Sequence, residues 1–503
     1  MQMNNTYDFI IIGSGFGGSI TAMCLVQRGF SVAIVEKDRH PRFAIGESST
    51  PAADMILRDL AESYDLPLLK KLSRYGSWQK HVPEVVCGLK RGFSYYFHEP
   101  GQPFQSSRDH SRELLVAAST DDKNSDTNWL RSDVDQLLSG YAADLGADLF
   151  EGTQIEKLNR SKDAWQVQAQ RDDEPLQMSA SWILDATGSP VFAERFLGVH
   201  SSSDGFYTNS RAVYSHYTGA GRWLDYLNEN SFYTDDYPYN PDHSALHQFT
   251  EEGWMWMLRF NNELLSAGFL IADNMGSENP KKPAEAQWQR LCNRYPSLKQ
   301  IFRNSNIAAR PGRIIQTGRL QRKLGRVFGN GWTALPHTAG FVDPLHSTGI
   351  SFTLSGIRRL LPILEQLDNG KLSVPDLNKY EETVGKELSF MDMLVSSCYI
   401  SRFRFDLFTA SVMLYFAAVI TWEQRYLSGN RDHAFLCPDI PDLYEMVSDT
   451  HGELLMLGSG PINDKKSAGL IERIRTRIEP FNRAGLMDPE KYNMYRHTAV
   501  TLS

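Results

Sequence analysis

The apolar pattern at the start of the chain predicts a strand, a helix and a second strand. Residues 7–12 form a continuous apolar run, glycines crowd residues 13–18, and a helix is expected over residues 19–28 before a second apolar run at residues 31–36. Short apolar runs that do not alternate with polar residues are typical of strands buried on both faces of a parallel sheet. This stretch therefore predicts a parallel βαβ unit.

Residues 89–98 predict one strand with two different faces. Apolar side chains, among them Phe93, alternate with polar ones along this stretch. Because successive side chains of a strand point to opposite faces, Lys90 and His98 are expected together on the face opposite Phe93.

The rest of the chain predicts an inserted sheet and a helical tail. Thr50 and Pro51 are typical of a helix start, which predicts a helix to about residue 63. Residues 201–260 mix short strand-like runs with polar turns, and the pattern becomes helical beyond about residue 360. The apolar stretch 407–420 is too short to span a bilayer, so we expect a buried helix and no membrane span.

Composition narrows the class of protein. With 41% hydrophobic and 22% charged residues, the 503-residue chain is typical of a globular protein with two or three structural units. Its net charge of −8 argues against nucleic acid as the main partner. The five cysteines form no CxxC pair and no metal-ligand spacing, and no signal peptide is visible. A cytoplasmic location without a bound metal is therefore expected.

The glycines after the first strand fit the dinucleotide-binding pattern G-x-G-x-x-G. Gly13, Gly15 and Gly18 occupy the glycine positions, and Glu36 ends the second strand. Glycine lets the backbone approach a pyrophosphate at the helix N-terminus, and an acid after the second strand accepts hydrogen bonds from a ribose. The alternative is a turn that only joins a strand to a helix, but the glycines, their flanking elements and the acid all agree with a nucleotide site.

A second motif favours FAD over NAD. Residues 185–188, with the sequence DATG, resemble the flavin signature of a strand that ends beside the first glycine turn. No other glycine-rich segment has a strand before it and a helix after it. We therefore expect no NADPH site in this chain, and reduced FAD has to come from outside.

The segment from Gly46 to Pro51, GESSTP, resembles the G-E-S/A-x-x-P segment of flavin-dependent halogenases, the tryptophan halogenase superfamily. Further segments agree with that family in the same order, at residues 88–93, 131–135, 253–256 and 340–349. Their detail is most similar to halogenases of pyrrole-type and phenol-type substrates, and so is the pair Cys398-Tyr399 in the helical tail.

The resemblance implies an FAD-dependent halogenase. Reduced FAD, supplied by a separate flavin reductase, reacts with dioxygen and chloride or bromide to give hypohalous acid, which halogenates an electron-rich aromatic ring. The substrate is a phenol or a pyrrole, free or tethered to an acyl-carrier protein. A monooxygenase or reductase of the same fold and a non-catalytic flavin-binding protein stay open as alternatives.

The motifs and the resemblance together imply an FAD site built from several segments. Its expected contacts are Gly13, Gly15, Phe16, Gly17, Gly18, Glu36, Lys37, Glu47, Ser48, Ser49, Arg131, Asp185, Gly188, Asp343, Gly349 and Ile350. For halide, the resemblance implies the turn of Ser347, Thr348 and Gly349, since backbone amides at such a turn form a small anion-binding concavity. The alternative is that this turn only caps the helix that follows it.

Lys90 is the expected catalytic residue, because an amine can polarise hypohalous acid or form a haloamine. A solvated lysine on an exposed strand face is the alternative, and Lys70, Lys71 and Lys80 are rivals. His346 stands where tryptophan halogenases carry a glutamate, so it is either a catalytic base or a residue that shapes the pocket.

Two departures from the family pattern bear on the mechanism. Leu258-Arg259 replaces an Ile-Pro pair that is thought to keep substrate away from the flavin, and this favours direct oxygenation. Pro336-His337 replaces the Gly-Asp pair of many flavoprotein monooxygenases, although pyrrole-type halogenases also have a histidine there.

The expected fold class is α/β, with a glutathione-reductase-like Rossmann domain that binds FAD. Residues 1–80, 115–190 and 306–369 are assigned to this domain, and residues 81–114 and 191–305 to an inserted β-sheet substrate domain. Residues 370–503 form a C-terminal helical region that closes one side of the substrate cavity.

Overall fold

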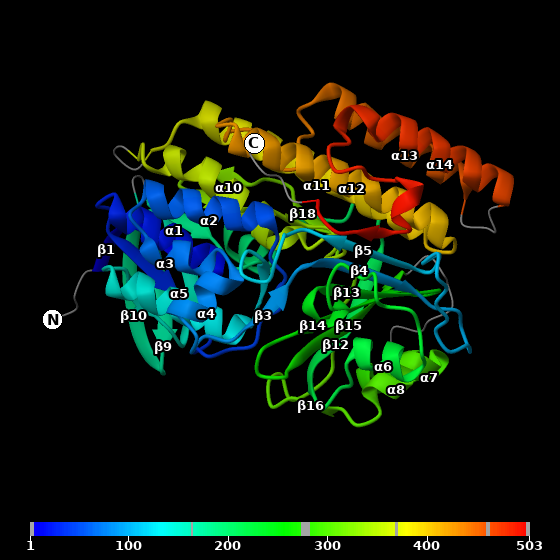
Figure 1. The fold of residues 1–503 in the computed structure, drawn as a ribbon. Helices are drawn as coiled ribbons and strands as arrows, with labels where there is room; N and C mark the ends of the chain where they lie inside the picture. Colours follow the sequence, from blue (N-terminus) through cyan, green and yellow to red (C-terminus); the bar gives the residue numbers. More distant parts are fainter. Residues whose placement is uncertain (1–4, 162–163, 273–281, 368–370, 459–462, 499–503) are drawn as a thin grey trace.

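Two large β-sheets lie beside each other, and helices from the later part of the chain lie across them (Figure 1). The structure is a computed structural model, and it describes residues 5–161, 164–272, 282–367, 371–458 and 463–498. The mixture of a largely parallel sheet, an antiparallel sheet and long helices confirms the predicted α/β class.

The first sheet contains the predicted βαβ unit. Strand β1 (Asn5–Ile12) pairs in parallel with β2 (Val32–Val35) and with β10 (Glu174–Asp185), and α1 (Phe16–Gln27) connects β1 to β2. The prediction of a parallel βαβ unit is therefore confirmed. The remaining strands of this sheet are β7 (Asp148–Phe150), β8 (Thr153–Arg160), β9 (Trp165–Arg171), β19 (Phe328–Gly329) and β20 (Trp332–Ala334).

Helices pack around this sheet. The predicted helix after Pro51 is confirmed as α2 (Pro51–Ser63), but the Thr50 side chain does not cap it. Thr50 Oγ1 instead lies 2.6 Å from Ser351 Oγ, which joins the start of α2 to α10 (Thr348–Leu364). The other helices of this part are α3 (Pro67–Leu72), α4 (Tyr75–His81), α5 (Arg131–Asp144) and α9 (Pro336–Ala339).

The second sheet is mostly antiparallel and is covered on both faces. Tyr96 of this sheet packs against Trp223 on one face, with ring centres 5.2 Å apart, and Tyr95 packs against Phe408 on the other, at 5.6 Å. Its strands are β4 (Gly92–Phe97), β5 (Glu113–Ala117), β12 (Ser210–Thr218), β13 (Ala245–Thr250), β14 (Gly253–Arg259), β15 (Leu265–Ala272), β16 (Asn306–Ile307), β17 (Ile315–Gln316) and β22 (Met494–Tyr495). Helices α6 (Trp223–Glu229), α7 (Ala284–Arg294) and α8 (Pro296–Phe302) accompany it.

Three parts of the chain join the second sheet from wholly or partly outside the ranges expected for the substrate domain. Strands β16 and β17 both pair with β12, which places residues 306–307 and 315–316 in this sheet. Strand β5 pairs with β4 and places residues 113–117 in the same sheet. Strand β22, from the C-terminal region, pairs with β5. A small third sheet contains β11 (Ser201–Ser202), β18 (Arg322–Leu324) and β21 (Gly340–Phe341).

The prediction of a single strand over residues 89–98 is wrong. The chain forms β3 (Cys87–Lys90), which pairs with β6 (Asp126–Trp129), and then β4 in the second sheet, with a break at Arg91. The break changes which side chains share a face. Lys90 Nζ lies 4.2 Å from the centre of the Phe93 ring, whereas His98 bonds to Gln248 on the side of Trp223.

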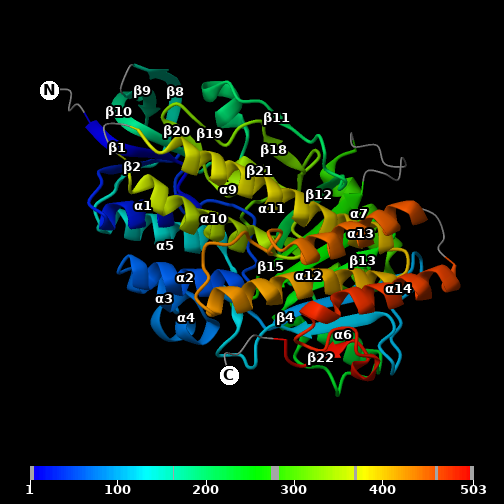
Figure 2. The ribbon, with the colours of Figure 1, turned by 90° about the horizontal axis from the view of Figure 1, so that it is seen from above.

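The C-terminal region consists of long helices, as expected from its pattern. They are α11 (Val374–Ser401), α12 (Phe405–Leu427), α13 (Pro441–Leu457) and α14 (Asp464–Ile478). Figure 2 shows α12 between α11 and α14. Helix α12 also contacts α2. At 23 residues α12 is longer than the apolar stretch 407–420 and, by length and composition only, is long and apolar enough to cross a membrane. Because 83% of its most apolar window is buried inside the protein, the expected buried helix is confirmed.

Candidate functional site

The glycine turn lies against the second flavin motif. The register of β1 and β10 sets Ile12 opposite Asp185, so the two strands end side by side. A side-chain carbon on Gly13, whose φ is +104°, would lie 2.8 Å from the Ala186 carbonyl oxygen, and one on Gly18 would lie 2.1 Å from the carbonyl oxygen of Gly13. Both positions therefore require glycine, and the expected contact between the two motifs is confirmed.

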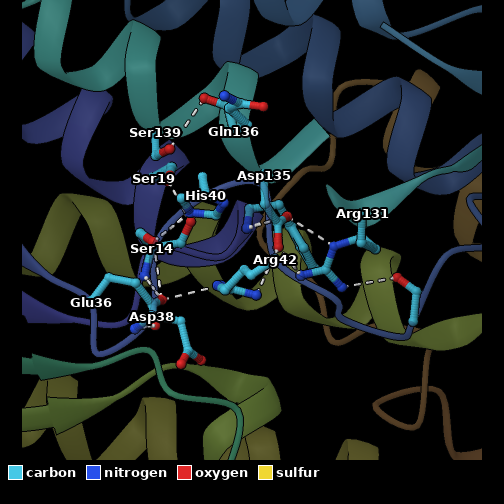
Figure 3. Close-up of polar contacts among 12 residues, drawn as sticks. Ser14, Ser19, Glu36, Asp38, His40, Arg42, Arg131, Asp135, Gln136 and Ser139 are labelled. Carbon is cyan, nitrogen blue, oxygen red and sulfur yellow. Dashed lines mark hydrogen bonds and ion pairs between the residues drawn. The ribbon is translucent and has the colours of Figure 1, made fainter. Parts of the chain in front are cut away.

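Glu36 binds the same turn from the end of β2. Its carboxylate accepts hydrogen bonds from the Ser14 amide at 3.1 Å, the Ser14 hydroxyl at 3.0 Å and the Asp38 amide at 3.1 Å, and it pairs with Arg42 at 3.2 Å (Figure 3). Burial opposes ionisation of this carboxyl, but Arg42 and the donated hydrogen bonds outweigh burial and lower its pKa below the usual value. The side chain is an ionised acceptor in the place where a ribose is expected.

Two guanidinium groups flank the start of α1. A side-chain carbon on Gly15 would lie 3.3 Å from Arg131 Nη2 and 3.6 Å from Arg42 Nη2. Asp135 holds both groups, because its carboxylate pairs with Arg131 at 2.8 Å and with Arg42 at 3.5 Å, and it accepts the Phe16 amide at 3.1 Å (Figure 3). The helix N-terminus and the two cations together suit a pyrophosphate.

Substitution of Glu36 by glutamine tests the ribose contact. The variant keeps the size of the side chain but loses its charge, so FAD affinity is expected to fall about tenfold. In the wild type the lowered pKa keeps Glu36 ionised at pH values where an ordinary carboxyl is already protonated, so FAD affinity should decline only as the pH falls below the ordinary carboxyl range. Fluorescence titration with FAD from about pH 3 to 8 measures both effects, and an equal affinity and pH dependence in the variant would contradict the assignment.

Buried polar atoms beside the turn provide a test of whether FAD fits. Among the residues that the structure describes, Glu47 Oε2, Ser48 Oγ, Asp185 Oδ2 and both polar side-chain atoms of Asn128 have no hydrogen-bond partner. Such orphaned groups are costly, and a polar ligand removes the cost. Glu47 is oriented by His216, whose Nε2 lies 2.8 Å from Glu47 Oε1. The segment from Gly46 to Ser49 therefore fits the polar edge of a flavin.

Lys90 connects this segment to the neighbouring side chains of the second sheet. Its side chain is fully buried, which excludes the solvated alternative, whereas Lys70, Lys71 and Lys80 are exposed. Lys90 Nζ donates a hydrogen bond to the Ser49 carbonyl. Burial lowers the pKa of Lys90 to about 8, although the carboxyl groups of Asp126 and Asp54 favour its charged form.

The turn before α10 lies next to the first sheet. Ser347 has a left-handed backbone with φ of 53° and precedes Thr348, the first residue of α10, and both side chains are largely buried. A side-chain carbon on Gly349 would lie 3.7 Å from the His337 ring, and one on Gly188 would lie 3.5 Å from it. His337 therefore lies between the two glycine segments, where the sequence showed only a departure from the Gly-Asp pattern.

His346 and Asp343 are buried on the side of the C-terminal helices. His346 stacks on Tyr415 with ring centres 4.3 Å apart, and burial lowers its pKa to about 3, so the imidazole is neutral. Asp343 accepts hydrogen bonds from Tyr399 and Ser210, each at 2.9 Å, and burial raises its pKa to about 7. A histidine that is so weakly basic suits the expectation of a pocket-shaping residue better than that of a base.

The other expected contacts differ in burial. Phe16 is buried against Trp129, and Ile350 is buried in α10. Lys37 is exposed, with 77% of its side chain accessible and only a 3.9 Å ion pair with Asp38. Sequence reasoning missed Arg42, because no motif marks an arginine on a loop six residues after the acid that it pairs with.

Comparisons with known proteins agree with a flavin site. The chain is 26% identical to monodechloroaminopyrrolnitrin halogenase PrnC of Pseudomonas fluorescens, over 91% of this chain and 82% of that protein. It is 25% identical to a 1H-pyrrole-2-carbonyl-(peptidyl-carrier protein) brominase of Pseudoalteromonas luteoviolacea (strain 2ta16), over 75% of this chain and 81% of that protein. The solved structure of halogenase PltM in complex with phloroglucinol and FAD has the same fold, with a TM-score of 0.82, 24% identity and coverage of 98% of this chain and 99% of that chain.

A family profile described as FAD dependent oxidoreductase matches residues 8–311, which is more than half of the 503-residue chain. The matched region contains the glycine turn, Glu36 and the second flavin motif. The match confirms FAD as the nucleotide that the two motifs predict. The chain therefore belongs to the family of FAD dependent oxidoreductases.

Proposed function

We propose that this oxidoreductase is a halogenase that uses reduced FAD, dioxygen and chloride or bromide to halogenate an electron-rich aromatic ring. The observation that carries the proposal is the place of Lys90. This buried amine bonds to the Ser49 carbonyl at one end of the segment expected to contact FAD, and it lies on the ring of Phe93, 4.2 Å from its centre. Phe93 lines a cavity.

The residues of this chain bind FAD and halide at two separate places. Glu36, Arg42 and Arg131 bind the adenosine and pyrophosphate half of FAD at the glycine turn. When bound, reduced FAD would supply two electrons to dioxygen, and the partly reduced oxygen would oxidise the halide to hypohalous acid. The turn of Ser347 to Gly349 binds the halide through backbone amides beside the flavin-binding strands.

Lys90 transfers the oxidant from the flavin side to the substrate side. An amine at this position either holds hypohalous acid through a hydrogen bond or takes the halogen from it, forming a nitrogen–halogen bond and releasing water. Because the pKa of Lys90 is lowered to about 8, part of the population is the unprotonated amine near neutral pH. The relatives named as a halogenase and a brominase support this reading of the site.

A turnover assay tests the proposed function. Purified protein is incubated with FAD, a separate flavin reductase, NADH and a panel of phenols and pyrroles, with the pyrroles also supplied on a carrier protein. The assay is run with chloride, with bromide and without halide. A halogenated product that requires halide is expected, and mass spectrometry of free and carrier-bound substrates identifies which form is accepted.

The same assay separates the alternatives. A hydroxylated product that forms with or without halide would replace halogenation by monooxygenation. That result would implicate Leu258-Arg259, the departure that favours direct oxygenation. Arg259 ends β14, and its buried side chain donates hydrogen bonds to the Ala220 and Gly221 carbonyls. The Arg259 carbonyl oxygen packs against Gly88 of β3, the strand that carries Lys90. FAD binding without any substrate-dependent consumption of NADH would instead indicate a non-catalytic flavoprotein.

A further inference from the structure

One buried carboxyl group holds the turn that is expected to bind halide. Asp343, which precedes this turn, is 3% exposed, and its Oδ1 accepts a hydrogen bond from the Leu345 amide at 3.1 Å. Its other oxygen, Oδ2, accepts hydrogen bonds from the hydroxyl groups of Tyr399 and Ser210, each at 2.9 Å. A single side chain therefore connects the backbone of the turn to α11 and to β12.

The turn needs this support because part of its backbone is strained. Ser347 has a φ of 53°, and the left-handed region is costly for a residue with a β-carbon. Such a conformation persists where the surrounding contacts determine it. The Ser347 amide donates to the Pro344 carbonyl at 2.9 Å, and Thr348 begins α10, so the far end of the turn is held by the helix. The near end is held through Asp343.

Tyr399 also accepts a hydrogen bond, and this sets the direction of its own. Trp254 of β14 donates its Nε1–H to the Tyr399 hydroxyl oxygen at 3.0 Å. An indole nitrogen can only donate and a tyrosine hydroxyl has one hydrogen, so that hydrogen points to Asp343. Burial and the nearby Asp343 carboxyl raise the pKa of Tyr399 far above its usual value, so the hydroxyl keeps its hydrogen near neutral pH. The chain of bonds therefore runs from Trp254 through Tyr399 to Asp343.

The hydrogen bonds to Asp343 favour its ionised form. Burial raises the pKa of this carboxyl to about 7, and Asp392, a second carboxyl on α11, adds to the rise. The bonds donated by the two hydroxyl groups and by the turn amide oppose the rise. An ionised carboxyl accepts bonds at both oxygens, whereas a protonated one has an O–H of its own to place. Loss of the Tyr399 bond would therefore weaken the contact between Asp343 and the turn.

We propose that Tyr399 is a positioning residue for halide binding. Its hydroxyl holds Asp343, and through it the turn of Ser347 to Gly349, in the conformation that presents backbone amides to the halide. Trp254, on the second sheet, acts on the turn through the same hydroxyl. The inference rests on the proposed function, because that function assigns the halide to this turn.

Chloride binding by the FAD-loaded protein tests the role of Tyr399. Line broadening of the chloride NMR signal measures the affinity, and the part of the broadening that bromide displaces is counted. Tyr399→Phe removes the hydroxyl and keeps the ring, so chloride affinity is expected to fall about tenfold while FAD affinity stays the same. In turnover, the KM for chloride should rise by the same factor, whereas kcat and the KM for the aromatic substrate should change less than about twofold. A residue that only stabilises the fold would not produce this split.

A second variant shows whether the two side chains act through one hydroxyl. Trp254→Phe removes the N–H that orients the Tyr399 hydroxyl, so a smaller loss of chloride affinity is expected. The double variant should bind chloride as weakly as Tyr399→Phe alone, because both changes act on the same bond to Asp343. Losses that add up in the double variant would overturn the proposed chain.

Tyr380→Phe is the matched control on the same helix. Tyr380 is buried, and its hydroxyl donates to the Ala334 carbonyl at 3.1 Å, so this variant should lose stability to urea as Tyr399→Phe does but keep the chloride affinity of the wild type. Unchanged chloride affinity in Tyr399→Phe, an equal loss of FAD affinity, or no displaceable chloride in the wild type would overturn the role of Tyr399. Chloride binding that depends on Tyr399 without any halogenated product would support this role while contradicting the proposed function.

Discussion

Substitution of Lys90 by methionine is expected to lower the rate of halogenated product formation about 100-fold or more, with FAD still bound. Methionine has nearly the same length and fills the same buried space, but it has no amine. The substitution removes the hydrogen bond to the Ser49 carbonyl and the group that would carry halogen towards Phe93. Product formation is measured by mass spectrometry and FAD binding by the flavin absorbance of the purified protein.

One further variant decides how Lys90 acts, and a second serves as its control. Lys90→Arg keeps a cation that can polarise hypohalous acid but replaces the amine with a group that stays protonated. Partial activity in Lys90→Arg would favour polarisation, and activity as low as in Lys90→Met would favour a haloamine. Lys80→Met, at an exposed lysine of α4, is the matched control and should behave as the wild type. Halogenation by Lys90→Met at the wild-type rate would remove Lys90 from the mechanism.

The nucleotide-binding unit could be predicted from sequence because its signals are local. The glycine turn, the flanking apolar runs and Glu36 all lie within the first part of the chain, and β1 and β2 pair as expected. The position of Asp185 beside the turn also follows from the motif, since the carboxyl ends of neighbouring parallel strands meet at one edge of a sheet.

The neighbourhood of Lys90 could not be predicted from alternation alone. Strand β3 pairs with β6, whereas Gly92 pairs with Ala117 of β5 in another sheet, so the chain changes sheets at Arg91. Side chains alternate between two faces only within one continuous strand. The break at Arg91 places the Lys90 amine over the ring of Phe93. The sequence motif identified the residue, but only the long-range pairing determines which side chains it contacts.

The C-terminal helices were predicted as elements that close one side of a cavity, but the buried carboxyl of Glu423 was not predicted. Glu423 lies just beyond the apolar stretch 407–420, at a point where a charged residue is equally typical of a helix that returns to solvent. In the structure α12 stays buried past this point, so the carboxyl lies inside the protein. Burial of this kind depends on α2 and α14 packing on α12, which no local pattern reports.

Gly18→Ala is expected to weaken FAD binding about 100-fold, equivalent to about 3 kcal/mol. The added methyl carbon would lie 2.1 Å from the Gly13 carbonyl oxygen, a backbone atom that cannot rotate away. The turn between β1 and α1 has to open, which also moves the Ser14 amide away from Glu36. The pyrophosphate and ribose contacts are then displaced together, so the loss exceeds that of any single hydrogen bond.

Gly140→Ala is the matched control, because it adds the same methyl group to a helical glycine without crowding. Gly140 lies inside α5, and a side-chain carbon there meets no atom within 4 Å. Alanine has the higher helix propensity, so the free energy of unfolding should rise by about 0.5–1 kcal/mol while FAD affinity stays the same. Urea unfolding and FAD titration of both variants provide the measurement. Wild-type FAD affinity in Gly18→Ala would mean that the turn tolerates a β-carbon, and the close approach of α1 to β1 would then not be what selects glycine at this position.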